Sequence, residues 1–334
     1  MKKPFRIDVA VLLIFFARPE QFRKVFEQVK IAKPSKLFLY QDGPRENNPD
    51  DITNIIQCRQ IAEDIDWECE VYKMYQERNY GCDPSEFIAQ KWAFSIVDEC
   101  IVLEDDDVPA QSFFSFCKEL LDRYRFDERI NMICGMNNTG VSEHTPYSYL
   151  FSTTGSICGW ASWKRVIDSW DESYSFLDDD FTLKQLEEVY KDKIDFPIFI
   201  RTCTNHRNSG KAHYESILSS SAFLNSRLNI VPAKNMISNI GVTDNATHSL
   251  SSVKMLPSGI RRIFNMKTYE IDFPLKHPEY VVDDVEFRRK LDRIMANGHP
   301  FVKFYRAIES ILLRIRYGDF RGLWQAVKKR VIHQ

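Results

Sequence analysis

Val102-Leu103-Glu104-Asp105-Asp106-Asp107-Val108-Pro109 is the stretch that decides the fold of this 334-residue chain. Its four carboxylates follow directly on a short apolar run, Cys100 to Leu103, which has the length and composition of a buried strand. In open α/β sheets, ligands lie in the crevice outside the carboxyl ends of the strands. The stretch therefore predicts both a strand and a polar site at its end.

The chain before this stretch alternates apolar runs with helical periods, which is typical of βα units and a mainly parallel sheet flanked by helices. We expect strands near 9–16, 36–40, 70–75 and 100–103. Helices are expected from Pro19, across 52–65 and from Pro84 to about Val97. The sequence thus predicts the α/β class, with Asp42 and the pair Arg78-Asn79 near the carboxyl ends of strands.

The second half is less regular. We expect a strand at 130–134, a turn at 135–140, a helix at 163–170, a strand at 196–201, and mostly loops from 202 to 258. The expected organisation is one catalytic domain over residues 1–260, with a donor half to about 130 and an acceptor half from about 131. A helical C-terminal extension is expected to follow over 261–334.

Composition limits the classes of function. Hydrophobic residues make up 44% of the chain, which is enough for a full core, and a net charge of −2 provides no field for gripping nucleic acid. The eight cysteines are far apart and form no C-x-x-C pair, which favours reduced thiols and a cytoplasmic location. The apolar run from Val9 to Ala17 is too short to span a bilayer of about 30 Å.

The C-terminal region changes character from about Pro300. Apolar residues recur at helical spacing from Phe301 to Ile315, and residues 301–334 hold eight Lys or Arg against Glu309 and Asp319. A basic amphipathic helix of this kind can lie on anionic lipid, here at the inner face of the membrane. The alternative is a helix packed on the main domain with its charges in water.

The acidic stretch itself has two interpretations. Crowded carboxylates raise one another's pKa, and a hard divalent cation such as Mn²⁺ or Mg²⁺ would offset that cost, bound by one or two carboxylates and the phosphates of a substrate. An N-terminal helix cap by Asp107 is the other interpretation. The cap would need only one carboxylate, so the metal is favoured.

At this point the residues resemble a known family, the GT-A glycosyltransferases, in the branch of N-acetylglucosaminyltransferase I and bacterial family 2-like nucleotide-diphospho-sugar transferases. The stretch from Val102 to Phe114 resembles the family's "LEDD-x-x-x-A-x-x-FF". Phe16-Ala17-Arg18-Pro19 resembles its "x-N-R-P", with Ala17 in place of Asn. Gly159-Trp160-Ala161 and Asp179-Asp180-Phe181 resemble its later "GW" and "DDW" elements, and the likeness covers about residues 8–250 in the family's order.

The resemblance implies a metal-dependent transfer of a hexosyl or N-acetylhexosaminyl group from a nucleotide-diphosphate sugar, with UDP expected, to a glycan or lipid-linked acceptor in polysaccharide assembly. It implies Asp106 as the direct metal ligand, and Asp105 as a further ligand that orients the ribose and the metal waters together with Glu104. His248 would be a late metal ligand, with His213 as a second candidate. The implied donor contacts are Arg18, Asp42, Arg78 and Asn79. Asp180 would be the base of an inverting reaction, although Asp178 to Asp180 also fit a solvated helix start before Leu183.

Two other functions remain open from the sequence. A sugar-nucleotide pyrophosphorylase shares the sheet and the metal, but it would need a glycine-rich phosphate loop after the first strand, where Phe16-Ala17-Arg18-Pro19 has no glycine. A non-catalytic carbohydrate-binding module would explain aromatics such as Trp160 and Trp163 without using the acidic stretch. In that case the loss of Asp106 would change neither ligand binding nor the response to Mn²⁺.

Overall fold

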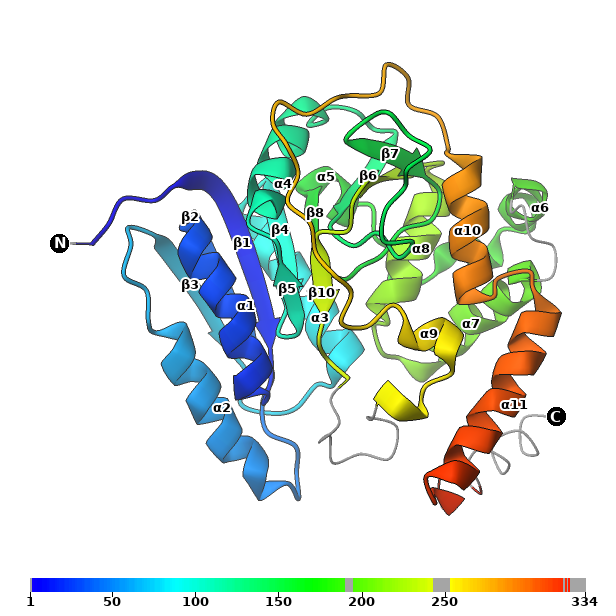
Figure 1. Ribbon diagram of the computed structural model, residues 1–334, viewed down its shortest axis with the longest axis horizontal. Coiled ribbons are helices and arrows are strands. Elements are labelled where there is room, and N and C mark those ends of the chain that lie inside the picture. Colours follow the sequence, from blue (N-terminus) through cyan, green and yellow to red (C-terminus); the bar gives the residue numbers. More distant parts are fainter. Residues whose placement is uncertain (1, 190–194, 243–252, 321, 323, 325–334) are drawn as a thin grey trace.

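A computed structural model describes residues 2–189, 195–242, 253–320, 322 and 324. An eight-stranded sheet in the order β3-β2-β1-β4-β8-β6-β9-β7 forms the centre, with helices on both faces (Figure 1). Its strands are β1 (Ile7–Phe15), β2 (Pro34–Gln41), β3 (Glu70–Tyr75), β4 (Glu99–Glu104), β6 (Ile130–Cys134), β7 (Tyr149–Ser152), β8 (Trp160–Trp163) and β9 (Leu228–Pro232). Only β7 and β8 run antiparallel to their neighbours, so the sheet is mainly parallel, as predicted.

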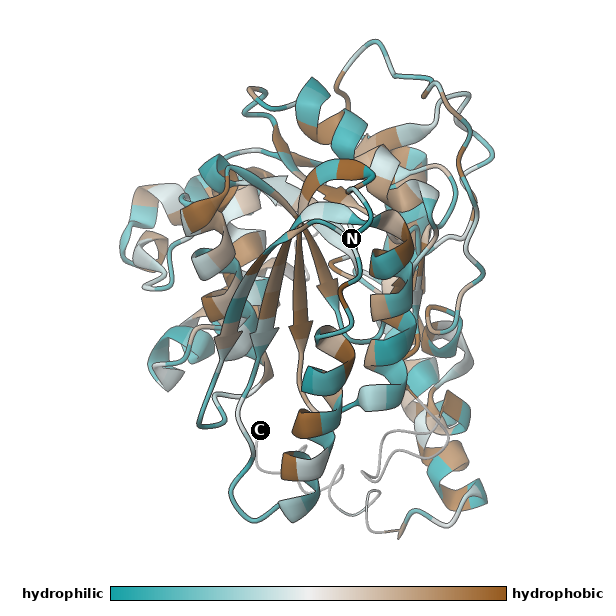
Figure 2. Cartoon of the chain, turned by 90° about the vertical axis from the view of Figure 1, so that its left-hand side faces the viewer, coloured by the Kyte–Doolittle hydropathy of each residue, from teal (hydrophilic) through white to brown (hydrophobic). Residues whose placement is uncertain are grey.

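Alternation along the strands produces two cores, one on each face of the sheet. In β1, Val11 and Leu13 join one hydrophobic cluster while Leu12 and Ile14 join the other. Figure 2 shows the strands as hydrophobic ribbons between helices that carry hydrophilic residues. Each large side chain buried in this way stabilises the fold by about 1.5–3 kcal/mol relative to an exposed one.

The first cluster is covered by α1 (Pro19–Ala32), α2 (Pro49–Ala62) and α4 (Ser112–Arg123). The second is covered by α3 (Cys82–Ile96), α5 (Lys164–Ile167), α6 (Asp180–Val189), α7 (Asp195–Ser209), α8 (Tyr214–Leu224) and α10 (Val285–Met295). In α1, Phe22, Val25, Phe26 and Val29 are all buried, at the spacing that predicted the helix. The predicted α/β class with flanking helices is confirmed, and the strand at 70–75 has the predicted bounds.

The strand predicted at 196–201 is wrong, because these residues belong to α7. Phe196 and Cys203 are buried in the second cluster, and Phe199 and Ile200 pack against it. These positions follow the i, i+3, i+4, i+7 spacing of a helix face. A short apolar run fits either element, and here the wider spacing decides for the helix.

The loops predicted for 202–258 are also largely wrong. After α7 come α8, β9 and a short strand β10 (Ile237–Asn239), which pairs with β5 (Asp107–Pro109) in a separate two-stranded sheet. In α8 the buried positions Tyr214, Ile217, Leu218 and Ser221 form one helix face. By local preference, serines favour turns and caps, so the serines of α8 do not predict a helix. The helix forms because tertiary packing stabilises it.

Residues beyond 260 also contribute to the main core. Ile271 and Leu275 lie in the first cluster, and Phe287 and Leu291 of α10 lie in the second. In chain order, this region contains α9 (Ser258–Arg261), α10 and α11 (Pro300–Arg316). Helix α11 begins where the sequence predicted. The domain boundary at 260 remains a prediction. Within the described ranges, no helix combines the length and hydrophobicity needed to cross a bilayer.

Candidate functional site

A cavity of about 390 Å³ opens at the carboxyl edge of the parallel strands, where β1, β2 and β4 end beside the first turn of α3. Connections from β1 and β4 leave in opposite directions at this edge, which is where open α/β sheets bind ligands. The lining residues are Ile14, Phe15, Phe16, Arg18, Asp42, Arg45, Asn79, Gly81, Cys82, Ser85, Glu86, Glu104 and Asp105. The edge predicted from the sequence therefore contains a cavity in which charged side chains lie beside apolar ones.

Five of the six residues predicted to contact a nucleotide donor line this cavity together: Arg18, Asp42, Asn79, Glu104 and Asp105. Arg78, the sixth, does not line it. Its guanidinium carbon lies 4.6 Å from the ring centroid of Tyr80, and its backbone packs against Gly43. Arg78 thus helps to shape the loop after β3.

Asp42 fastens that loop to the end of β2. Its carboxylate accepts hydrogen bonds from the amides of Gly43, Tyr80 and Gly81 at 2.9–3.0 Å and from Nδ2 of Asn79 at 2.8 Å. Both oxygens are engaged by protein donors. Asp42 therefore lines the cavity chiefly as the residue that holds one wall in place.

The protein itself supplies partners for three of the four successive carboxylates. Arg18 forms ion pairs with Asp105 and, at 2.8 Å, with Asp106, and its side chain is 40% exposed while both carboxylates are buried. Asp106 also accepts from Nδ2 of Asn239 at 3.1 Å, and Asp107 accepts from the amide of Gly159 at 2.8 Å. The repulsion expected from the sequence is thus partly offset without a metal.

The interpretation of Asp107 as a helix cap is wrong. Asp107 begins β5, and α4 starts at Ser112 without a side-chain cap from its N-cap residue Gln111. The carboxylate of Glu270 instead accepts from the amides of Gln111 and Ser112, at 3.1 and 2.7 Å. Since Glu270 lies 158 positions from Ser112, local sequence could not reveal this arrangement.

Glu104 differs from its three neighbours. It lines the cavity, and its carboxylate has no hydrogen-bond or ion-pair partner within the described ranges. Burial raises the pKa of Glu104, and the charges of Glu86 and Asp107 raise it further. Burial raises the pKa of Asp106 as well, although the ion pair with Arg18 opposes this. Negative charge at this edge remains incompletely compensated.

Several residues of the site were not predicted from the sequence, above all Glu86 and Arg45. Glu86 is buried in α3 and accepts a 3.0 Å hydrogen bond from Gln90, one turn along the helix. Arg45 lines the cavity, pairs with Asp51 through two hydrogen bonds, and lies over the ring of Phe16. A polar residue on the core-facing side of α3 was the available signal for Glu86.

Glu86→Gln is expected to stabilise the protein at alkaline pH. Burial, followed by the charges of Asp107 and Asp105, raises the pKa of Glu86 in the folded state, so stability is lost as pH rises from the ordinary glutamate range through the raised pKa. The loss amounts to about 1.4 kcal/mol for each unit by which the pKa is raised, and a neutral amide at this position removes it. Urea unfolding of the wild type and the variant at pH 4.5, 6 and 8 measures this difference in the free energy of unfolding.

Glu68→Gln is the matched control for this prediction, because Glu68 is exposed and lies outside the cavity. It should leave the pH dependence unchanged. If Glu86→Gln were less stable than the wild type at pH 8, the ionised carboxylate would be making an essential interaction and the prediction would be wrong.

Asp180 lies apart from the cavity. It begins α6, it is exposed, and it does not line the cavity; Figure 1 shows α6 well separated from α3 and β4. Its neighbour Asp179 accepts from the amide and hydroxyl of Thr182, as at a helix start. The role of Asp180 as a base remains a prediction.

The structure describes only some of the residues that the sequence predicted as metal ligands. His248 lies outside the described residues. His213 stacks on His206 with ring centroids 3.8 Å apart, and its Nδ1 lies 3.3 Å from Asp83. Within the described ranges, no three side chains of His, Cys, Asp or Glu are arranged as a metal site.

Comparisons with known proteins give little further information. No family model matches the sequence, and no curated protein matches it. The chain is similar in structure to a UDP-glucose pyrophosphorylase complexed with UDP-glucose. The similarity covers 48% of this chain and 78% of the pyrophosphorylase, with 10% identity and a TM-score of 0.28. It is also similar to 4-diphosphocytidyl-2C-methyl-D-erythritolsynthase from Anaerococcus prevotii. That similarity covers 58% of this chain and 84% of the synthase, with 7% identity and a TM-score of 0.28. Similarity at this level assigns neither fold nor activity, which rest on the chain's own residues.

Proposed function

We propose that this chain is a divalent-metal-dependent glycosyltransferase that takes a hexosyl or N-acetylhexosaminyl group from a nucleotide-diphosphate sugar. The observation that carries the proposal is the shared cavity, in which Arg18, Asn79 and Glu104 meet at the carboxyl edge of the sheet. A cation, an amide and unpaired carboxylate charge are the groups needed to bind a diphosphate with its metal and to orient a sugar. The proposed donor nucleotide is UDP, and the proposed acceptor is a hydroxyl of a glycan or lipid-linked sugar.

The donor set fits Mn²⁺ or Mg²⁺, since these ions take oxygen ligands and bind through one or two carboxylates plus substrate phosphates. Among the described residues, the carboxylate of Glu104 has no partner and lines the cavity, and Asp106, which does not itself line the cavity, follows two residues later. Asp106 and Asp105 are the proposed ligands, with Glu104 oriented toward metal-bound water or ribose. When bound, the ion would neutralise charge on the departing diphosphate.

Arg18 would have two roles in this scheme. Without a ligand it neutralises Asp105 and Asp106. If Asp106 held a metal, the guanidinium would have to release the Oδ2 that it now contacts, and its fork of N–H donors would then suit the donor's phosphate oxygens. The first turn of α3 lies at the same cavity, and the positive end of the helix dipole there favours negative charge.

The remaining catalytic task is deprotonation of the acceptor hydroxyl. We keep Asp180 as the proposed base of an inverting transfer, which requires α6 and the cavity to approach each other around a bound acceptor. A base must come within hydrogen-bond reach of the proton it removes. In this region the half-buried Arg207 of α7 forms an ion pair with the exposed Asp178 at 2.9 Å.

A panel of nucleotide sugars tests the proposal. The purified chain should release a nucleoside diphosphate from one donor, with UDP-sugars expected first, only when Mn²⁺ or Mg²⁺ is present and not after chelation. Turnover that persists in excess chelator would contradict the metal. Release of pyrophosphate from a nucleoside triphosphate and a sugar phosphate would instead identify a pyrophosphorylase, and donor or glycan binding without turnover would indicate a binding module.

A further inference from the structure

The apolar face of α11 is exposed along the whole helix. Its members recur at helical spacing, and each is between 37% and 87% exposed: Phe301, Phe304, Tyr305, Ile308, Ile311, Leu312 and Ile315. By contrast, α10 buries Phe287 and Leu291 in the main core. The expectation that α11 simply packs on the main domain therefore does not account for its apolar face. Contiguous exposed apolar surface of this kind marks an interaction site.

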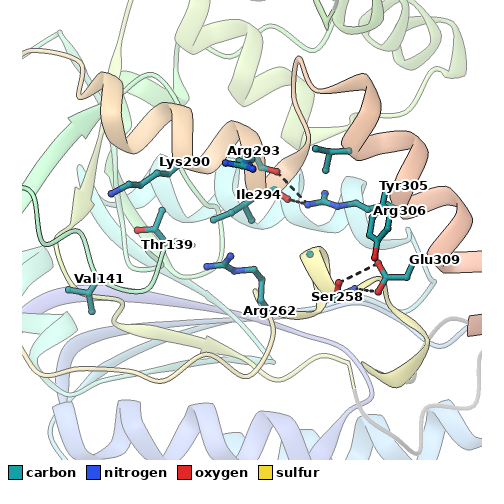
Figure 3. Close-up of a pocket in the computed structure, with 12 residues that line it drawn as sticks. Thr139, Val141, Ser258, Arg262, Lys290, Arg293, Ile294, Tyr305, Arg306 and Glu309 are labelled. Carbon is teal, nitrogen blue, oxygen red and sulfur yellow. Dashed lines mark hydrogen bonds between the residues drawn. The ribbon is translucent and has the colours of Figure 1, made fainter.

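A second cavity, of about 620 Å³, lies beside this face between α9, α10 and α11 (Figure 3). Four cationic side chains line it: Arg262, Lys290, Arg293 and Arg306. Glu309 is the one carboxylate in its described lining, and it accepts from the amide and hydroxyl of Ser258. The cavity therefore carries a clear excess of positive charge.

Three of the four cations form no ion pair within the described ranges, and two of these three also form no side-chain hydrogen bond there. Lys290 pairs with Glu286 at 2.8 Å, and Arg306 donates to the carbonyl of Ile294 at 2.6 Å. No ion pair joins Arg262 or Arg293 to a described carboxylate. Two guanidinium groups that face one cavity and have no described carboxylate partner suit a phosphate, whose oxygens accept paired N–H donors.

Tyr305 links the cavity and the apolar face, because it lines the first and belongs to the second. An occupant of both must present phosphate charge next to hydrocarbon, which is the chemistry of an anionic lipid in a bilayer. The helix itself carries Lys303, Arg306, Arg314 and Arg316 against Glu309, so its charge complements such a surface.

We propose that α11 lies on an anionic membrane surface through its exposed apolar face and that the cavity between α9, α10 and α11 holds a lipid headgroup phosphate. Membrane binding of this kind goes beyond the proposed glycosyl transfer and has a readout independent of it. A soluble protein partner on the apolar face would not require phosphate in the cavity.

Sedimentation of the full chain with vesicles tests this proposal. Vesicles of phosphatidylcholine with phosphatidic acid should bind the protein, whereas phosphatidylcholine alone should bind it at least about tenfold less, and added salt should weaken the binding. Each cation near the surface contributes about 1 kcal/mol, so the double variant Arg262→Ala, Arg293→Ala should bind roughly 25-fold less tightly. The double variant Phe301→Ser, Phe304→Ser should also lose binding, and its fold should be unaffected because both side chains are exposed.

Arg23→Ala combined with Lys24→Ala is the matched control, because it removes the same charge from exposed positions of α1. Equal weakening by this control would overturn the proposal in favour of non-specific attraction. Equal binding to neutral and anionic vesicles would overturn it as well. If the wild type ignored both vesicles yet bound inorganic pyrophosphate through Arg262 and Arg293 in calorimetry, the ligand would be a free phosphate and the lipid would be excluded.

Discussion

Asp106→Asn is expected to lower metal-dependent release of the nucleoside diphosphate by at least about 100-fold while the protein stays folded. Changes next to metal ligands typically cost about 10- to 100-fold, and the loss of a direct carboxylate ligand should cost more. The amide keeps the size of the side chain and can still accept from Asn239, and Arg18 keeps Asp105 as a partner. Initial rates at saturating Mn²⁺, with thermal unfolding in parallel, measure the effect.

Asp106→Ala extends this test, because it also removes one of the two carboxylates that accept from Nδ2 of Asn239, and activity should disappear. Asp127→Asn is the control: Asp127 pairs with Arg129 at 2.7 Å and contacts neither Arg18 nor Asn239. This variant should keep full activity. If Asp106→Asn retained more than half of the wild-type rate at the same metal concentration, Asp106 would not be the ligand and the proposed function would lose its central residue.

The cavity wall was predictable because the relevant residues follow strands. In a parallel sheet, the carboxyl ends of β1, β2 and β4 meet at one edge, so Arg18, Asp42 and Glu104 could be grouped from their positions in the chain alone. Apolar spacing also predicted α1 and β3 closely. Where local pattern and topology agree, position in the sequence is enough to place a side chain.

The partners of those residues were beyond the reach of the sequence. Asp106 meets Arg18 from 88 positions away and Asn239 from 133 positions away, and neither pairing leaves a local pattern. The crowding of carboxylates in the sequence therefore overstates the charge that a metal would have to compensate. Glu104, which has no partner among the described residues, is the carboxylate whose charge the protein leaves uncompensated beside the proposed ligands Asp105 and Asp106.

The second half of the chain was harder to predict for a related reason. In α7 and α8 the decisive contacts are with the second core cluster, so Phe196 and the serines of α8 follow their tertiary setting and not their local preference. For Asp180 the prediction came from the resemblance to a family and not from local preference. The resemblance implied a role in the reaction, whereas in the structure Asp180 is exposed at the start of α6.

Gly43→Ala is expected to destabilise the protein by about 3 kcal/mol, at the upper end of the range for overpacking, and to weaken donor binding by at least about tenfold. A Cβ at this position would lie 2.5 Å from the backbone carbonyl carbon and oxygen of Arg78, and backbone cannot move aside as a side chain can. Displacement of Arg78 would also pull Asn79, which donates to Asp42 and to the carbonyl of Gly43, out of the cavity wall.

Gly210→Ala separates steric overlap from backbone strain in this prediction. Gly210 has a φ of +65° with no heavy atom within 4 Å of the added Cβ, so its substitution costs only the left-handed conformation, about 1 kcal/mol. Chemical unfolding of both variants, with nucleotide affinity from calorimetry, should show a larger loss for Gly43→Ala in both quantities. Wild-type affinity in a destabilised Gly43→Ala protein would mean that the loop after β3 can shift without disturbing the donor, and that the wall held by Asp42 serves stability alone.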